Sequence, residues 1–243
     1  VSRGQVEYGH ALFRLGRRDE AGTWFEAALA GSSDSYTKGE TARWVAERLP
    51  WEGGPARSDG INLAESWYIR AFDFGSDMAA VALGQRLREV GDINRASLSF
   101  ERSVEHSKGA TATFIALGLQ GRGNRPQTAD EAAERVRWLR RGAELGDRSS
   151  MHDYAAALSD GQGVRRNDVE AFRWYEAAAR HPHAQAPDMV LLAELHLDGR
   201  GVPADAVAAA SALRASRSMR LDDSDTITRD RVRELGRRLQ AAR

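Results

Sequence analysis

The sequence predicts an all-α fold built from a repeated pair of antiparallel helices, and three observations lead to this prediction. One spacing, usually an alanine followed three and four positions later by larger residues, recurs six times along the 243 residues. Apolar residues between these copies follow a helical period among good helix formers. The alternation of Val, Ile and Thr that marks strands is absent from the sequence.

The recurring spacing predicts the second helix, B, of every pair. Its first positions lie 32 to 43 residues apart, so six copies fill the chain. The copies are Ala21-x-x-Trp24-Phe25, Ala64-x-x-Trp67-Tyr68, Ala96-x-x-Ser99-Phe100, Arg135-x-x-Trp138-Leu139, Ala171-x-x-Trp174-Tyr175 and Ala209-x-x-Ala212-Leu213. We expect the aromatic residues to fill the space between one helix pair and the next.

A second pattern lies upstream of each copy and predicts the first helix, A. A large apolar residue precedes a small one, as in Tyr8-Gly9 and Leu83-Gly84, and the small residue lets neighbouring helices approach closely. One pair cannot bury both of its faces, so stability requires stacking. We therefore predict one domain over 1–243, with repeats at about 5–35, 36–75, 76–108, 109–147, 148–183 and 184–220.

These patterns resemble known helical repeats. The segments 8–29 and 76–106 look like tetratricopeptide repeats, whereas "DGQGVRRNDVEAFRWYEAAA" and "LAELHLDGRGVPAD" are similar to Sel1-like repeats, which have a longer A–B loop. The likeness is weak over 36–74 and 121–130. The resemblance implies a right-handed α-solenoid of about six helix pairs, with a concave groove lined by A helices. It also implies a protein-binding scaffold without catalysis.

The C-terminal segment departs from the repeat, and 224–242 is predicted to be a capping helix. Asp225 or Thr226 would start it, and Ile227, Val232, Leu235 and Leu239 would form its apolar side. A terminal helix with a polar outer face closes a solenoid. A separate docking helix is the alternative.

Composition excludes several classes of site. Lys plus Arg equals Asp plus Glu, at 35 each, so no net charge attracts nucleic acid or an anionic membrane. Without cysteine the chain has no disulfide, thiolate zinc site or cysteine nucleophile. No apolar run is long enough to span a membrane. A signal peptide or lipid anchor that has been removed is left open.

The Gly-x-Gly loops at Gly121, Gly161 and Gly199 raise the question of phosphate binding. A dinucleotide loop follows a strand and needs a third glycine, but these loops follow helical segments, lack that glycine and recur with the repeat. We interpret them as hinges between helices A and B, in which glycine takes the left-handed conformation. Val164 and Val202 would anchor the loops on the core.

No other pattern indicates chemistry. The six histidines are scattered, and His181-Pro182-His183 lies in a turn without further ligands. "DDSD" at 222–225 lacks the glycine and distal glutamate of an EF-hand and is interpreted as a helix cap. No nucleophile, base and carboxylate stand in a catalytic order. The chain is therefore expected to be no enzyme and to use no metal or cofactor.

The arginines of "RVRWLRRGAE" at 135–144 have glutamates at helical spacing, so a solvated, balanced face is predicted. An anionic partner patch is the alternative.

The family likeness places the groove two positions before and two after each large-small pair. Those positions are Val6 and His10, Val81 and Gln85, Ile115 and Leu119, His152 and Ala156, Val190 and Glu194. From this region the candidate partner-binding residues are His10, Gln85, Arg88, Leu119, His152 and Glu194. This lining has no row of Lys or Asn, so a clamp for a C-terminal carboxylate is not expected in this groove. A helix or an extended segment of a partner protein suits it better.

The expected function is a scaffold that holds partner proteins in a bacterial envelope assembly, polysaccharide export or signalling complex. By resemblance alone the periplasm is the expected compartment, with the cytoplasm as the alternative. A second hypothesis is a regulatory repeat module cut from a larger membrane protein or enzyme. The sequence leaves the oligomeric state and the partner open.

Overall fold

A computed structural model describes residues 2–51, 62–120, 127–219 and 226–241. The chain divides into two compact units, Val1–Ser107 and Lys108–Arg243, and the division falls at the end of the third predicted repeat. Over the described ranges the secondary structure consists of thirteen helices, without a strand. The all-α prediction is thus confirmed, while a single domain over 1–243 stays a prediction.

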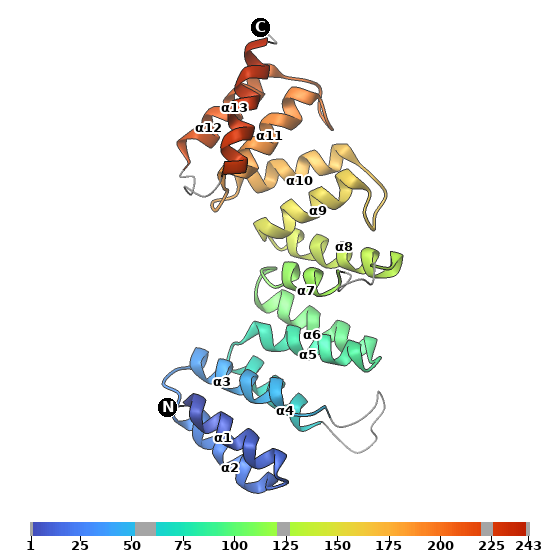
Figure 1. Cartoon of the computed structure of the whole chain (residues 1–243). Coiled ribbons are helices and arrows are strands. Elements are labelled where there is room, and N and C mark those ends of the chain that lie inside the picture. The colour runs from blue at the N-terminus through green and yellow to red at the C-terminus, as the bar shows by residue number, and fades with distance from the viewer. Residues whose placement is uncertain (1, 52–61, 121–126, 220–225, 242–243) are drawn as a thin grey trace. The chain divides into compact units, whose positions relative to one another are not determined.

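Unit 1 contains three antiparallel helix pairs, and each pair lies within one predicted repeat (Figure 1). Consecutive pairs pack on one another through α2 and α3 and through α4 and α5. The first helices of the pairs also touch, α1 with α3 and α3 with α5. The helices are α1 (Ser2–Arg14), α2 (Arg18–Ala30), α3 (Ser35–Arg48), α4 (Leu63–Asp73), α5 (Asp77–Glu89) and α6 (Ile93–His106).

Unit 2 contains three further pairs and a terminal helix (Figure 1). Its pairs pack consecutively through α8 and α9 and through α10 and α11. The terminal helix, α13, packs on both α11 and α12. The helices are α7 (Ala112–Gly118), α8 (Ala129–Glu144), α9 (Arg148–Asp160), α10 (Asp168–Arg180), α11 (Ala186–Asp198), α12 (Ala206–Ser218) and α13 (Thr226–Ala241).

Glycines on the A helices allow the aromatic residues of the B helices to pack closely. A Cβ added at Gly9 would lie 2.5 Å from the Phe25 ring, and one added at Gly84 would lie 2.4 Å from the Phe100 ring. Phe25 also meets Trp67 of the next pair edge to face, with ring centroids 5.9 Å apart. The large-small pattern and the aromatic positions therefore form the predicted inter-helix contacts.

The last position of the recurring spacing is buried in all six copies. The side chains are Phe25, Tyr68, Phe100, Leu139, Tyr175 and Leu213. The position before it varies from the buried Trp67 to the partly exposed Trp24. One face of each B helix therefore enters the core, and the neighbouring position lies at its edge.

The Gly-x-Gly loops after α9 and α11 are hinges, as predicted. Gly161 and Gly199 end these helices with φ of 70° and 65°, in the left-handed region where glycine has no steric penalty. Val164 and Val202 pack at the edge of the hydrophobic core. The loop with Gly121 lies outside the described residues.

The second glycine of each hinge has a role that the sequence did not reveal. A Cβ at Gly163 would lie 2.3 Å from the carbonyl oxygen of Ala132 in α8, and one at Gly201 would lie 2.0 Å from that of Asp168 in α10. Each hinge therefore touches the backbone of the preceding B helix. Glycine at this position fixes the spacing between consecutive repeats.

The terminal helix closes unit 2 through an apolar stripe. Leu235 and Leu239 are buried against Val190 of α11 and Leu213 of α12, and Val232 packs beside them. Ile227 was predicted on this side but is 76% exposed, whereas Thr228 is buried. The prediction for Ile227 was wrong because the stripe through 239, 235 and 232 continues to 228 at helical spacing. Asp225 and "DDSD" lie outside the described residues.

Substitution of Gly201 by Ala tests the inter-repeat contact. The new Cβ would meet a backbone oxygen that cannot rotate away, so we expect a loss of stability of about 3 kcal/mol or more. Gly146→Ala is the matched control, because Gly146 in the same unit also has a positive φ but has nothing within 4 Å of an added Cβ. The control should cost only about 1–2 kcal/mol. Urea-induced unfolding followed by circular dichroism measures both, and equal losses would contradict the role of the contact.

Candidate partner-binding surface

In unit 1 the predicted partner-binding residues lie on α1 and α5. His10 is buried, and its ring centroid lies 4.9 Å from that of Phe25. Burial, followed by the positive charge of Arg48, lowers the pKa of His10, so the neutral imidazole is favoured. Gln85 and Arg88 are half-buried on α5. Of these three side chains, only Gln85 and Arg88 reach solvent to a substantial degree.

The first position of most predicted groove pairs belongs to the core instead. Val6, Val81, Ile115 and Val190 are buried. Leu119, a second-position residue, is also buried, and its carbonyl accepts a hydrogen bond of 2.9 Å from the Gln127 amide. These residues face adjacent helices, because stacking brings the A helices of neighbouring pairs into contact. Placing the four first-position residues in the groove lining was therefore an error, and a binding role for Leu119 stays a prediction.

His152 joins two repeats instead of standing alone on α9. Its Nδ1 lies 3.3 Å from Oδ1 of Asp188 on α11, and its ring meets Tyr175 of α10 edge to face. Arg148 of α9 donates to both carboxylate oxygens of Asp188, at 3.1 and 2.9 Å. Only 2% of the Asp188 side chain is exposed. We call Arg148, His152 and Asp188 the inter-repeat clamp.

The charge of Asp188 is stabilised in spite of its burial. Burial alone would raise the pKa of its carboxyl group, but the adjacent His152 imidazole, a hydrogen bond from the Gln185 N–H and the charge of Arg148 hold the pKa below its usual range. The Gln185 N–H donates to Oδ2 of Asp188 over 2.8 Å, and this hydrogen bond caps the start of α11. Asp188 therefore combines helix capping with attachment of one repeat to the next.

Tyr175 forms the apolar side of this region. Burial, followed by the negative charge of Asp160, raises the pKa of Tyr175 to about 12. Its hydroxyl group is thus protonated at neutral pH. The contact with His152 is therefore one between a neutral phenol ring and an imidazole, which supports packing.

Glu194, the last predicted groove residue, has a partner within the chain. Arg231 of α13 donates through Nε to its Oε1 over 2.8 Å and also reaches Oε2. Arg238 of α13 pairs with Asp198 at the end of α11. The terminal helix therefore engages this acidic side of α11, and Glu194 is already paired within the chain.

Ion pairs such as these recur one repeat apart in the sequence. Arg148 and Asp188 are separated by 40 residues, Arg231 and Glu194 by 37, and Arg70 and Glu26 in unit 1 by 44. Inspection of the sequence missed these pairs, although separations close to the repeat length were a signal that could have indicated them.

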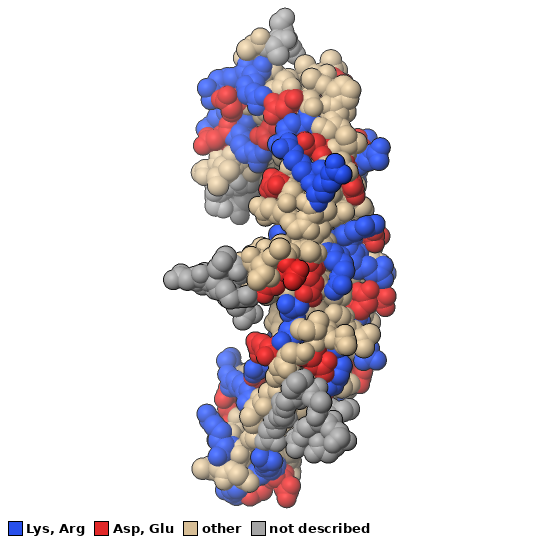
Figure 2. All heavy atoms as spheres, turned by 90° about the vertical axis from the view of Figure 1, so that its right-hand side faces the viewer, with Lys and Arg blue, Asp and Glu red and all other residues tan. Residues whose placement is uncertain are grey.

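Two of the four arginines of α8 have glutamate partners on the same helix, as predicted. Nε of Arg140 donates to Glu144 over 2.8 Å, and Arg137 lies 3.9 Å from Glu134 and over the Trp138 ring. On the face drawn in Figure 2, cationic and anionic residues lie beside one another in both units.

Residues that could hold a metal do not converge in the described ranges, where no cluster of three His, Asp or Glu side chains has the required arrangement. His183 is exposed and His181 is half-buried, and the His183 N–H donates to His181 Nδ1 over 3.1 Å. Among the described helices, none has the length and apolar character of a membrane span.

Stacked antiparallel helix pairs, Gly-x-Gly hinges and a closing helix define an α-helical repeat protein. Comparison with family models identifies Sel1 repeats at residues 136–147, 148–183 and 186–211, all in unit 2. Unit 2 therefore contains Sel1 repeats over these residues. Comparison with curated proteins finds no significant match.

Two solved structures are similar to this chain. A Sel1 repeat protein from Oxalobacter formigenes aligns with 17% identity and a TM-score of 0.48, over 89% of this chain and 86% of the other. The protein c5321, a protective antigen of uropathogenic Escherichia coli with an SLR fold, aligns with 18% identity and a TM-score of 0.54. That alignment covers 99% of this chain but 51% of c5321, so the chain spans about half of that protein.

Neutralising Asp188 by substitution with Asn tests the inter-repeat clamp. The substitution leaves the largely buried Arg148 without its charged partner, so we expect a loss of about 3 kcal/mol at pH 7. Because the pKa of Asp188 is lowered by folding, its contribution is present above the unfolded value of about 3.9 and is lost as the pH falls through the folded value. The difference between wild type and Asp188→Asn should therefore shrink below about pH 4.

Urea unfolding at pH 7 and pH 3 measures this difference. Asp230→Asn is the control, since Asp230 pairs with Arg233 on an exposed face of α13 and should contribute less than about 1 kcal/mol at either pH. A pH-independent loss in Asp188→Asn would contradict the ionised clamp.

Proposed function

We propose that this chain is a non-catalytic scaffold that binds segments of partner proteins on the exposed side of its A helices. The observation that carries the proposal is the stacking of successive A helices, with α1 against α3 and α3 against α5 in unit 1, and α7 against α9 in unit 2. Sel1 repeats in unit 2 support it, because helical repeats that stack in this way form extended binding surfaces.

The side chains on this surface suit a protein partner. Gln85 and Arg88 on α5, and Ala156 on α9, are partly exposed and mix polar with small apolar character. On the face drawn in Figure 2, cations and anions are interspersed instead of forming the basic patch that nucleic acid requires. A partner helix or an extended segment would gain its affinity from a few anchors on such a surface.

A further anchor is available in unit 1. Tyr8 of α1 and Trp24 of α2 meet edge to face with centroids 4.9 Å apart, and both are exposed. Tyr and Trp are common in the energetically dominant part of protein interfaces. The pair thus offers an apolar contact beside the polar residues of the A helices.

The biological setting that we propose is a bacterial envelope assembly, polysaccharide export or signalling complex, with the periplasm as the compartment. It follows from the resemblance to Sel1-like proteins. A regulatory module within a larger membrane protein or enzyme is the second candidate, and the full open reading frame would separate the two.

Photo-crosslinking in the source cells tests the scaffold. A photoreactive amino acid at Gln85 or Ala156 lies on the A helices, whereas one at Arg102 of α6 or Arg173 of α10 lies on exposed B-helix positions. We expect a discrete set of crosslinked proteins from the A-helix positions alone. The same products from both sets, or products from B helices alone, would contradict the proposed surface. Recovery of the crosslinked proteins in the periplasmic or the cytoplasmic fraction tests the compartment.

His152 is unsuitable as a surface probe, because it belongs to the inter-repeat clamp. A glutamate at this position would lie beside the buried Asp188 carboxylate, and like charges at that distance would destabilise the repeat. Loss of binding in such a variant would report unfolding instead of a lost contact.

A further inference from the structure

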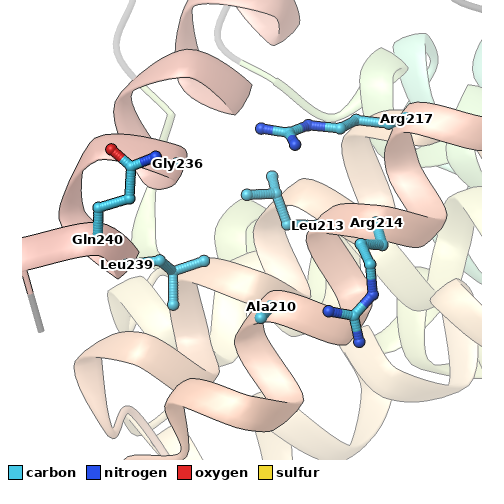
Figure 3. A pocket seen from close by; sticks show the side chains of 7 residues that line it. All are labelled: Ala210, Leu213, Arg214, Arg217, Gly236, Leu239 and Gln240. Atoms are coloured by element: carbon cyan, nitrogen blue, oxygen red, sulfur yellow. The ribbon is translucent and has the colours of Figure 1, made fainter. Parts of the chain in front are cut away.

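A small pocket lies between α12 and the terminal helix α13, away from the A-helix surface. Its volume is about 260 Å³. Arg214 and Arg217 of α12 stand on one side and Gln240 of α13 on the other, with Leu213 and Leu239 between them (Figure 3). The pocket therefore combines two cations, an amide and an apolar floor.

The two arginines have no carboxylate partner in the described part of the chain. They are exposed, and neither has an ion pair or a hydrogen bond to a described side chain. The segment 206–218 that forms α12 contains no Asp or Glu. By contrast, the cations of α13 are engaged, with Arg237 paired to Glu234 and Arg238 to Asp198. Among the described residues, no carboxylate thus compensates the two positive charges at this pocket.

The spacing of the arginines suits one small anion. Residues three apart on a helix are neighbours on its surface, so the guanidinium groups of Arg214 and Arg217 can reach the same ligand. Arginine binds a carboxylate through two parallel N–H donors. The Gln240 amide on the opposite wall can supply a further donor.

The floor of the pocket is apolar, and a glycine lets one of the arginines approach it. Leu213 and Leu239 are buried members of the core that joins α12 and α13. A Cβ added at Gly236 would lie 3.2 Å from Nη2 of Arg217. The missing side chain therefore lets the Arg217 guanidinium lie close to α13, beside the apolar floor.

We propose that this pocket binds the C-terminal residue of a partner protein. Its free carboxylate would pair with Arg214 and Arg217, and its apolar side chain would rest on Leu213 and Leu239. The volume favours one residue, since about 260 Å³ lies just below the range of about 300–1,000 Å³ for small-molecule sites. Among protein residues only a C-terminal one carries a free backbone carboxylate and an apolar side chain on the same carbon.

This proposal rests on the proposed function as a protein-binding scaffold, and it adds a second surface. The lining predicted along the A helices lacks a carboxylate clamp, and that prediction is unaffected because the pocket is formed by a B helix and the terminal helix. A partner could lie along the A helices and place its chain end here, or bind at this pocket alone.

N-acetyl-leucine and its amide are matched probes, since they differ in the carboxylate. Titration into the 243-residue chain, followed by methyl NMR of Leu213 and Leu239, should show binding of the acid in the millimolar range, about 1 mM. The amide should bind at least about tenfold more weakly, because it loses a charge-assisted contact with arginine. N-acetyl-glycine, which lacks the apolar side chain, should also bind more weakly.

Three variants locate the site. Arg217→Gln should weaken binding of N-acetyl-leucine about tenfold or more. Gly236→Leu should abolish it, because the new side chain would displace the Arg217 guanidinium and enter the pocket, while Leu favours the helix more than Gly does. Arg165→Gln removes an exposed arginine from the hinge after α9 and should leave binding unchanged. Unchanged circular dichroism and unfolding midpoints establish that each variant is folded.

Equal binding of acid and amide would overturn the proposal, as would no shift of either leucine up to about 10 mM N-acetyl-leucine. Inorganic phosphate that binds as tightly as N-acetyl-leucine would also overturn it, because the site would then recognise anions in general. Unaltered binding in Gly236→Leu would exclude this pocket.

The outcome is separable from that of the scaffold proposal. If Gly236→Leu loses N-acetyl-leucine but Gln85 and Ala156 still crosslink the same partners, both surfaces operate independently. If crosslinking at the A helices fails while N-acetyl-leucine binds, the A-helix surface is rejected and the pocket stands.

Discussion

Contact between consecutive helix pairs is the constraint on which the rest of this structure depends. An antiparallel pair has two broad faces and buries only part of its apolar surface by itself, so every pair needs a neighbour. The B-helix aromatics supply apolar contact, as where Phe25 meets Trp67. Glycine allows neighbouring backbones to approach closely, since Gly201 lets a hinge lie against the backbone of α10. The polar contribution comes from ion pairs between residues about one repeat apart, such as Arg148 with Asp188.

This arrangement explains why conspicuous motifs in the chain are structural. The Gly-x-Gly loops place left-handed glycines at the ends of α9 and α11, and their recurrence follows from the recurrence of the turn. The clamp histidine, His152, contacts a buried carboxylate and a phenol ring instead of solvent. Residue types that serve catalysis elsewhere here fix the spacing of repeats, while the surfaces that we propose for partners lie on the less conspicuous residues of the A helices and of α12.

The terminal helix covers the end of the last repeat and forms a pocket there. Leu235 and Leu239 cover the apolar side of the last pair, and Arg231 and Arg238 neutralise acidic groups of α11. Because α13 packs on both α11 and α12, it also forms a pocket with α12. Its two arginines, Arg214 and Arg217, have no carboxylate partner among the described residues. Arg137 and Arg140 of α8, by contrast, pair with glutamates of their own helix.

The sequence by itself determined the helical class, the six pairs and their B-helix core positions. The hydrophobic period, helix propensity and glycine placement are local properties of the sequence, and they recur in each repeat. It could not determine which A-helix positions remain exposed, since Val6 and Gln85 differ in burial only through the helices that pack on them. Nor could it determine the partner of Glu194, which depends on the side of α11 where α13 docks. The tertiary structure decided these features, because they depend on contacts between residues that are far apart in the sequence and that meet only when the helices pack.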